Sequence, residues 1–408
     1  MTTNSQIVDP TIAADAVRFL TDPTSRRDPW EFFQRLRAHS PVHRTATGVW
    51  LVAGYDVAGE VLRNDAVLSR REAGLKHVVV DDPEAKKIFT SRMLYNDRPE
   101  HTRLRRLVAH AFTRNGIARW DSRIREVSHQ VLDAVCPSGR MDLVHDFAYR
   151  VVEQIITELL GIRHGDLPLF MKWSAAMTEA PPGGDIGSFR DAANQATHEV
   201  TAYVRERIAE RRAQPSDDLL SKLIAAEDAE DGRLAEHELV AMTFELIFAG
   251  YETTSNFIGN GMYCLLSHPD QLRALARDRT LLPGAIDEML RYESPAPMPL
   301  PRVAIEDVVV GGHTIRKGDT VVVLLASANR DPAHFPNPEI FDIQRTNNNF
   351  ISFGFGAHFC LGQALARLES TGILTALLDR LPSLRLDGEA RWSDHQFFRS
   401  LEMLPVTW

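Results

Sequence analysis

A single cysteine in a glycine-punctuated loop constrains this chain more than any other feature. Residues 353–362 read Phe-Gly-Phe-Gly-Ala-His-Phe-Cys-Leu-Gly, and a helical pattern begins directly after them. Gly354, Gly356 and Gly362 tolerate a positive φ and let the backbone approach a flat ligand closely. The N-terminus of the following helix points toward Cys360, and that positive end favours the thiolate over the thiol. The loop therefore predicts a soft, thiolate-type ligand for iron.

The decapeptide resembles the haem-binding loop of the cytochrome P-450 monooxygenases, Phe-Gly-x-Gly-x-His/Arg-x-Cys-x-Gly, and every fixed position is present. In that family the thiolate binds the iron of haem b (iron protoporphyrin IX) and favours O–O cleavage. By this resemblance Cys360 is the metal ligand, and Phe353, Gly354, His358 and Gly362 contact the cofactor. A buried, inert cysteine is the alternative if the motif stood alone. Three further motifs in family order oppose that alternative.

Composition describes an ordinary globular protein with a large core: 408 residues, 44% hydrophobic and 25% charged. Length alone suggests two or three domains. However, the chain has no linker or repeat, and the resemblance implies one cytochrome P-450 domain over residues 1–408. The net charge of −9 argues against a nucleic-acid partner. The three cysteines, Cys136, Cys264 and Cys360, fit a reducing compartment better than a disulfide framework.

The beginning of the chain lacks the basic and apolar regions of a signal peptide, and no run reaches the roughly 18 apolar residues of a membrane span. We therefore expect no membrane association. Within the family this implies the soluble bacterial type, which is cytoplasmic and monomeric. By the same resemblance, its electrons come from a ferredoxin and a ferredoxin reductase.

Hydrophobic periodicity predicts a mainly α protein with a smaller β region (α+β). The resemblance implies that this is the cytochrome P-450 fold. The β-rich parts are a hairpin near residues 42–52 and a second region near 300–325. Breaks are expected at residues 181–184 and at Pro215. The longest helices are expected at 147–160, 192–212 and 239–267.

The predicted helix at 239–267 is apolar nearly all round and should be buried. In its middle, Ala249 and Gly250 are small enough to let it pass close over a flat cofactor, and Thr253 can bond to a carbonyl one turn earlier. A kink with a capped threonine is the alternative. The segment resembles the family's Ala/Gly-Gly-x-Asp/Glu-Thr-Thr element. That resemblance makes Glu252 and Thr253 the catalytic pair that supplies protons for O–O cleavage.

Four basic residues match the positions that bind the haem propionates in the family. His101 and Arg105 lie four residues apart and share one helix face. They match a His-x-x-x-Arg pair, while Arg302 and His358 match two further contacts. Arginine is the natural bidentate partner of a carboxylate.

A carboxylate and a guanidinium at i,i+3, Glu288 and Arg291, match the family's Glu-x-x-Arg element. By the resemblance, Arg345 completes a buried triad with them. A bidentate arginine clamp would hold the cysteine loop in place. We assign these three residues a structural role, not a catalytic one.

The substrate pocket is the least defined part of the sequence. The resemblance places Phe248 and Met298 nearest the iron and Phe397 in a C-terminal turn that contributes to the same cavity. Apolar residues in these places fit a lipophilic small molecule. Each of the three could equally belong to the core.

The resemblance predicts a monooxygenase that inserts one atom of dioxygen into a C–H bond of a lipophilic small molecule, by hydroxylation or epoxidation. Natural-product, steroid and terpene metabolism are all compatible with it, and the substrate is either free or bound to a carrier protein. Two alternatives stay open. The first is a haem-thiolate enzyme with another outcome, such as oxidative coupling or ring formation. The second is a haem protein that binds a ligand without turnover. A zinc site fails because no second cysteine lies at zinc-finger distance from Cys360.

Overall fold

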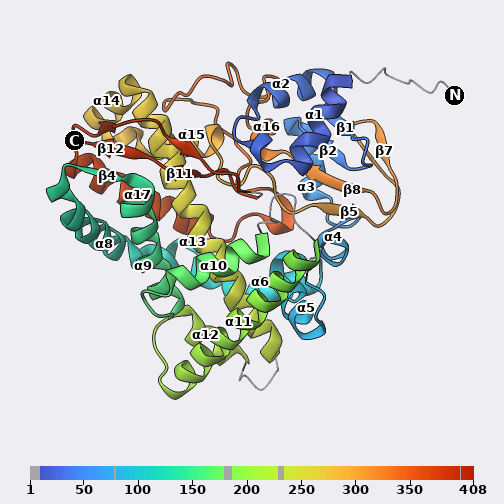
Figure 1. Cartoon of the computed structure of the whole chain (residues 1–408), viewed down its shortest axis with the longest axis horizontal. Helices are drawn as coiled ribbons and strands as arrows, with labels where there is room; N and C mark the ends of the chain where they lie inside the picture. Colours follow the sequence, from blue (N-terminus) through green and yellow to red (C-terminus); the bar gives the residue numbers. More distant parts are fainter. Residues whose placement is uncertain (1–9, 78–79, 179–185, 228–233, 396) are drawn as a thin grey trace.

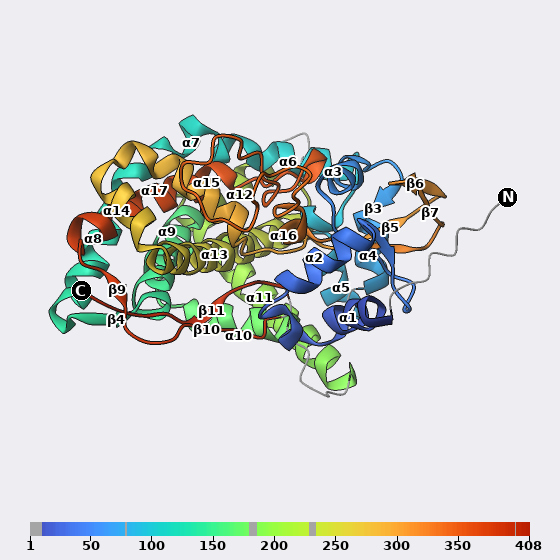
Figure 2. The same ribbon diagram turned by 90° about the horizontal axis from the view of Figure 1, so that it is seen from above.

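A computed structural model of the chain describes residues 10–408 except 78–79, 179–185, 228–233 and 396. The long helix α13 (Glu236–Ser267) crosses the middle of the molecule, and the other helices pack around it (Figures 1 and 2). Every residue from Leu239 to Ile247 is buried, as the apolar pattern predicts. The fold is mainly α with small β-sheets, and the predicted fold class is confirmed.

The remaining helices divide into those near the β-rich end and those of the helical body (Figure 1). The first group is α1 (Pro10–Thr21), α2 (Trp30–His39), α3 (Tyr55–Arg63), α4 (Arg70–His77), α5 (Pro83–Thr90) and α16 (Leu325–Ala328). The second group is α6 (Glu100–Ala109), α7 (Arg114–Ala118), α8 (Trp120–Val135), α9 (Tyr149–Leu160), α10 (Leu167–Thr178), α11 (Ile186–Ala213), α12 (Leu219–Glu227), α14 (Pro269–Arg277), α15 (Leu282–Tyr292) and α17 (Gln363–Arg380).

The largest sheet joins strands from opposite ends of the sequence in the order β1-β2-β8-β5-β3. Gly48, with φ 84°, makes the turn of the predicted β1–β2 hairpin, and β8 pairs with β2 in parallel. Its strands are β1 (Val42–Arg44), β2 (Trp50–Val52), β3 (Leu68–Ser69), β5 (Arg302–Ala304) and β8 (Thr320–Val323). The smaller sheets contain β6 (Val308–Val310) with β7 (His313–Ile315), β4 (Arg140–Asp142) with β12 (Pro405–Thr407) and β9 (Arg385–Leu386), and β10 (Arg391–Trp392) with β11 (Leu401–Met403).

The predicted helix boundaries differ from the observed ones in instructive places. The expected helix at 147–160 begins instead as a π-helical turn (Leu143–Ala148), and α9 follows it. Helix α11 ends at Ala213, two residues before the predicted break at Pro215. The break expected at 181–184 lies outside the described residues. Among the described residues, no helix combines the length and the apolar character needed to cross a membrane.

Candidate haem-thiolate site

The cysteine loop is a tight turn that ends at the N-terminus of α17. The Cys360 amide donates to the Phe353 carbonyl at 2.9 Å, which closes the loop. Gly354 and Gly356 have φ of 71° and 75°, as predicted. For Gly362 the expected positive φ is wrong, because this residue has φ −82° at the start of α17. A Cβ at Gly354 or Gly362 would meet no atom within 4 Å, so the loop leaves open space at both glycines.

Two opposing effects act on the Cys360 thiol. Burial raises its pKa, whereas the backbone amides of Gly362 and Gln363 and the guanidinium groups of Arg105 and Arg367 lower it. These amides open α17, so the helix N-terminus acts on the sulfur as the sequence predicts. Burial is nevertheless the larger effect in the protein alone. A metal ion deprotonates the thiol that coordinates it, and this overrides the cost of burial.

Two imidazoles lie together beside this loop. The ring centroids of His101 (α6) and His358 are 4.1 Å apart. His101 is buried, and neither of its ring nitrogens has a hydrogen-bond partner in the part of the chain that the structure describes. Burial, with a smaller effect of Arg105, lowers the pKa of His101 to about 4. Burial likewise lowers the pKa of His358. Both rings are thus neutral donors in a positively charged environment.

Three arginines supply that positive charge. Arg105 donates to the Phe359 carbonyl at 2.7 Å, which ties α6 to the cysteine loop. Arg302 is buried and pairs with Asp65 at 2.9 Å, but its Nε has no partner among the described residues. Arg70 was not predicted from the sequence. It is buried, its Nε has no partner within the described part of the chain, and burial lowers its pKa to about 9. Only the position of α4 in the fold brings Arg70 to this site.

Helix α13 presents the predicted Ala249 and Thr253. Ala249 is exposed in the middle of an otherwise buried helix, and the Thr253 hydroxyl donates to the Ala249 carbonyl at 2.6 Å, as predicted. Gly250 has a packing role that the sequence did not predict. A Cβ at this position would lie 2.4 Å from Ile156 Cδ1, so glycine lets α13 pack against α9.

The side chain of Glu252 has two polar contacts that the sequence did not reveal. Ser174 (α10) donates to Glu252 Oε2 at 2.8 Å. His395, between β10 and β11, places its Nε2 3.1 Å from Glu252 Oε1. These contacts join three elements that are distant in the sequence.

The predicted triad is present, with Glu288 and Arg291 fully buried and Arg345 partly buried. Arg291 clamps Glu288 with two hydrogen bonds of 2.7 and 2.8 Å, and Arg345 Nε contacts both carboxylate oxygens at 3.2 and 3.3 Å. The Asp342 amide and the Asn348 side chain also donate to Glu288. The carboxylate therefore connects α15 to the segment that precedes the cysteine loop.

The three expected substrate contacts have different environments. Phe248 is half-buried and packs edge-on against Phe244 at 4.7 Å. Met298 packs against the hydrophobic cluster formed by α1, α2 and β2, and Phe397 is 39% exposed. Direct contact with a substrate stays a prediction for all three.

The cluster at the cysteine loop fits a flat ligand that carries two carboxylates. Buried nitrogens of His101, Arg70 and Arg302 have no hydrogen-bond partner among the residues that the structure describes, and they are the donor types that bind carboxylate. Open space at two loop glycines and an exposed Ala249 on α13 leave room for a planar group. A thiol at the start of α17 completes the set.

Comparison with known proteins decides the family. The family profile described as Cytochrome P-450 matches residues 26–393. This chain belongs to the cytochrome P-450 family. It is 41% identical over 390 residues to the cytochrome P-450 monooxygenase PikC of Streptomyces venezuelae, covering 93% of this chain and 91% of PikC. It is 37% identical over 397 residues to the polyketide biosynthesis cytochrome P-450 PksS of Bacillus subtilis, covering 93% of this chain and 96% of PksS.

A solved structure supports the same assignment. The cytochrome P-450 fold of P450BioI, determined in complex with an acyl carrier protein ligated to hexadec-9Z-enoic acid, matches with a TM-score of 0.86. The identity is 34%, and the match covers 94% of this chain and 100% of that chain. The protein is therefore a cytochrome P-450 monooxygenase, and its cofactor is the family's haem b with a cysteine thiolate ligand.

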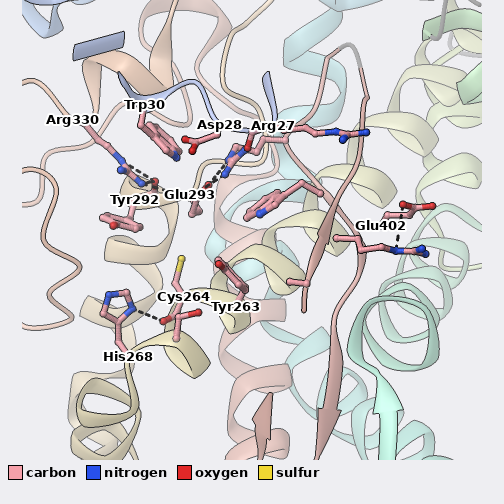
Figure 3. A pocket seen from close by; sticks show the side chains of 15 residues that line it. Arg27, Asp28, Trp30, Tyr263, Cys264, His268, Tyr292, Glu293, Arg330 and Glu402 are labelled. Carbon is pink, nitrogen blue, oxygen red and sulfur yellow. Dashed lines mark hydrogen bonds and ion pairs between the residues drawn. The ribbon is translucent and has the colours of Figure 1, made fainter. Parts of the chain in front are cut away.

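An open cavity of about 620 Å³ lies away from this cytochrome's cysteine loop, at the C-terminal end of α13 (Figure 3). The buried charged residues that line it form ion pairs: Arg399 binds Glu293, and Arg330 binds Glu293 and also Glu339 outside the cavity. Arg330 also stacks on Trp30, with the guanidinium carbon 3.5 Å from the ring centroid. None of the predicted site residues lines this cavity. We interpret it as a structural ion-pair cluster.

Glu369 on α17 is a second buried carboxyl that the sequence did not reveal. Burial raises its pKa to about 8, and a hydrogen bond from Thr254 opposes this effect. Because the folded pKa exceeds the unfolded value of 4.5, the stabilisation is complete below about pH 4.5 and disappears as the pH rises to about 8. We expect the free energy of unfolding of the haem-loaded protein to fall over this window by at most roughly 5 kcal/mol.

Urea unfolding at several pH values tests this effect. Glu369→Gln should remove most of the slope above pH 6, while Glu245, whose pKa burial raises to about 6, leaves a slope at lower pH. Glu306→Gln, at an exposed position, is the control and should leave the slope unchanged. An identical slope in Glu369→Gln and the wild type would contradict the assignment.

Proposed function

We propose that this cytochrome P-450 hydroxylates a C–H bond of a lipophilic natural product of the polyketide or acyl type, with Cys360 as the haem ligand. The observation that carries the proposal is the convergence of His101, His358 and the arginine cluster on the Cys360 loop. The names of PksS and of the P450BioI complex support the substrate class. We further propose that electrons arrive from a ferredoxin and its reductase, and that the protein is cytoplasmic.

When bound, the haem supplies dioxygen activation, and the protein must supply protons to a site from which bulk water is excluded. We assign this task to Glu252 and Thr253. The Thr253 proton points to the Ala249 carbonyl, which leaves the hydroxyl oxygen free to accept a hydrogen bond on its other side. Glu252 is only 16% exposed, so it can connect the outer polar region with the interior. The two propionates of the bound haem would be held by the basic residues beside the cysteine loop: His101, His358, Arg70, Arg105 and Arg302.

The Thr253→Ala variant should bind haem normally but form product inefficiently. Removing a positioned proton donor or acceptor typically costs a factor of about 10² or more in the assisted step. NADPH consumption should therefore continue, while product per NADPH falls at least tenfold and peroxide rises. The test compound is the member of a panel that shifts the haem spectrum most. The panel contains free hexadec-9Z-enoic acid, its carrier-protein thioester, a macrolactone and a steroid.

Thr243→Ala is the matched control for this experiment. Thr243 also lies on α13 and also donates to a carbonyl four residues earlier, Leu239, at 2.9 Å. Its loss should leave coupling unchanged. Unchanged coupling in Thr253→Ala, or equal loss in both variants, would refute the proposed role of Thr253.

A further inference from the structure

Two side chains hold Glu252, a hydroxyl and an imidazole. Ser174 provides a hydroxyl at 2.8 Å, and His395 provides Nε2 at 3.1 Å. The His395 and Glu252 side chains are 8% and 16% exposed, so water competes little for the contact. The loop that carries His395 is fixed to α13, because Asn260 donates to the Arg399 carbonyl at 2.8 Å.

The tautomer of His395 follows from the hydrogen bonds at its other ring nitrogen, Nδ1. The backbone N–H groups of Phe397 and Phe398 both donate to His395 Nδ1, each at 3.1 Å. A nitrogen that accepts two N–H donors must keep its lone pair, so the single ring proton lies on Nε2. Protonation of Nδ1 would place its new N–H next to two backbone N–H groups, and donors that face each other repel. This arrangement makes Nδ1 the acceptor and points the Nε2 N–H at Glu252.

The remaining described neighbours of Glu252 are phenols and not fixed cations. The ion pairs of the described residues include no lysine or arginine partner for this carboxylate. Two phenols lie nearby, Tyr149 on α9 and Tyr251 on α13. Burial, with a smaller effect of Glu252, raises the pKa of both, so they stay neutral. A full cation beside a carboxylate would lower its pKa by about one to three units and make it a poor proton acceptor.

We propose that His395 is a positioning residue that holds the Glu252 carboxylate with a neutral N–H donor, which keeps this carboxylate able to accept and release protons. This inference rests on the proposed proton-transfer role of Glu252. His395 cannot itself carry protons from solvent through Nδ1, because the backbone amides occupy that nitrogen. We infer that His395 fixes the direction of the hydrogen bond to Glu252 and adds no positive charge beside the carboxylate.

Three substitutions separate this role from a role in loop structure. His395→Asn keeps an acceptor for the Phe397 and Phe398 amides but lacks the donor to Glu252. His395→Gln keeps a neutral donor at the reach of Nε2, and His395→Arg keeps a donor but adds a permanent charge. In the haem-loaded protein with the panel compound chosen above, we expect His395→Asn to lower product per NADPH roughly tenfold. That factor is typical of one hydrogen bond to a charged group.

The same inference predicts that His395→Gln retains most of the coupling and that His395→Arg loses at least as much as His395→Asn. All three variants should also keep the wild-type carbon monoxide difference spectrum. A purely structural role predicts the opposite order, because only His395→Asn preserves the turn. Wild-type coupling in His395→Asn or in His395→Arg would overturn the proposal.

A second measurement does not depend on turnover. In the reduced, carbon monoxide-bound protein, ¹⁵N NMR of labelled histidine at pH 7 should show one ring with bare Nδ1 and protonated Nε2. This signal should be absent in His395→Gln. An imidazolium signal from this residue near pH 7 would overturn the proposal. Glu252→Gln completes the design. If it leaves coupling unchanged, the proposed relay fails and this inference with it. If it uncouples while His395→Asn does not, only this inference fails.

Discussion

The Cys360→His variant is expected to lose the long-wavelength Soret band that reduced, carbon monoxide-bound cytochromes P-450 show, and its monooxygenase turnover should fall to background. A thiolate pushes electron density onto the iron, whereas an imidazole is a neutral and weaker donor. Absorption spectra of the dithionite-reduced protein with and without carbon monoxide measure this directly. The haem content, determined separately, shows whether any cofactor remains bound.

Cys136→Ser is the control, because Cys136 is half-buried at the end of α8 and far in sequence from the loop. It should keep both the spectrum and the turnover. A long-wavelength band that survives in Cys360→His would show that another residue is the ligand. Loss of the band in Cys136→Ser would point to the same conclusion.

The second large effect concerns stability. Glu288→Gln removes the only charge that compensates Arg291 and Arg345 within their triad, and the Glu288 and Arg291 side chains have no exposed surface. Breaking a buried pair by removing one partner typically costs about 3–5 kcal/mol. Domains are stable by only roughly 5–15 kcal/mol, so this loss is large. We expect a strongly lowered melting temperature and poor haem retention.

Asp307→Asn provides a matched change of charge at the surface. Asp307 pairs with Arg316, and both side chains are more than half exposed, at 51% and 70%. Its loss should leave the free energy of unfolding nearly unchanged, because water screens an exposed ion pair. Thermal unfolding and haem content of the two variants should therefore differ clearly. Equal melting temperatures would mean that the triad does not hold the segment before the cysteine loop.

Much of the fold follows from periodicity and turn chemistry. The apolar pattern of residues 239–267 predicts a buried helix, and α13 is that helix with three more residues at its start. Turn residues around Gly48 predict the hairpin that opens the large sheet. The parallel pairing of β2 with β8 could not be predicted from local sequence patterns, because it joins strands that are hundreds of residues apart.

The site residues also fall into two groups, those predictable from local sequence and those brought together only by the fold. Cys360, the Glu288–Arg291 pair and the Thr253 hydrogen bond were predictable because short spacings place these groups in one loop or on one helix face. Arg345 lies 57 residues from Glu288 and was identified only through the family resemblance. The packing role of Gly250 could not be predicted, because its neighbour Ile156 belongs to another helix. Arg70 was missed for the same reason, because its contacts with this site come from a helix that is distant in the sequence.

The sequence by itself determined which chemical groups this protein has and how they are spaced locally: a thiol at the start of a helix, an acid beside an alcohol in a buried helix, and an arginine clamp. Those features depend on bonds and dihedral angles within a few residues. Only the tertiary structure decided which distant groups meet, such as His395 with Glu252 and Arg70 with the two histidines. The physical reason is that burial and long-range contacts, which set the protonation and direction of these side chains, exist only after the chain has packed.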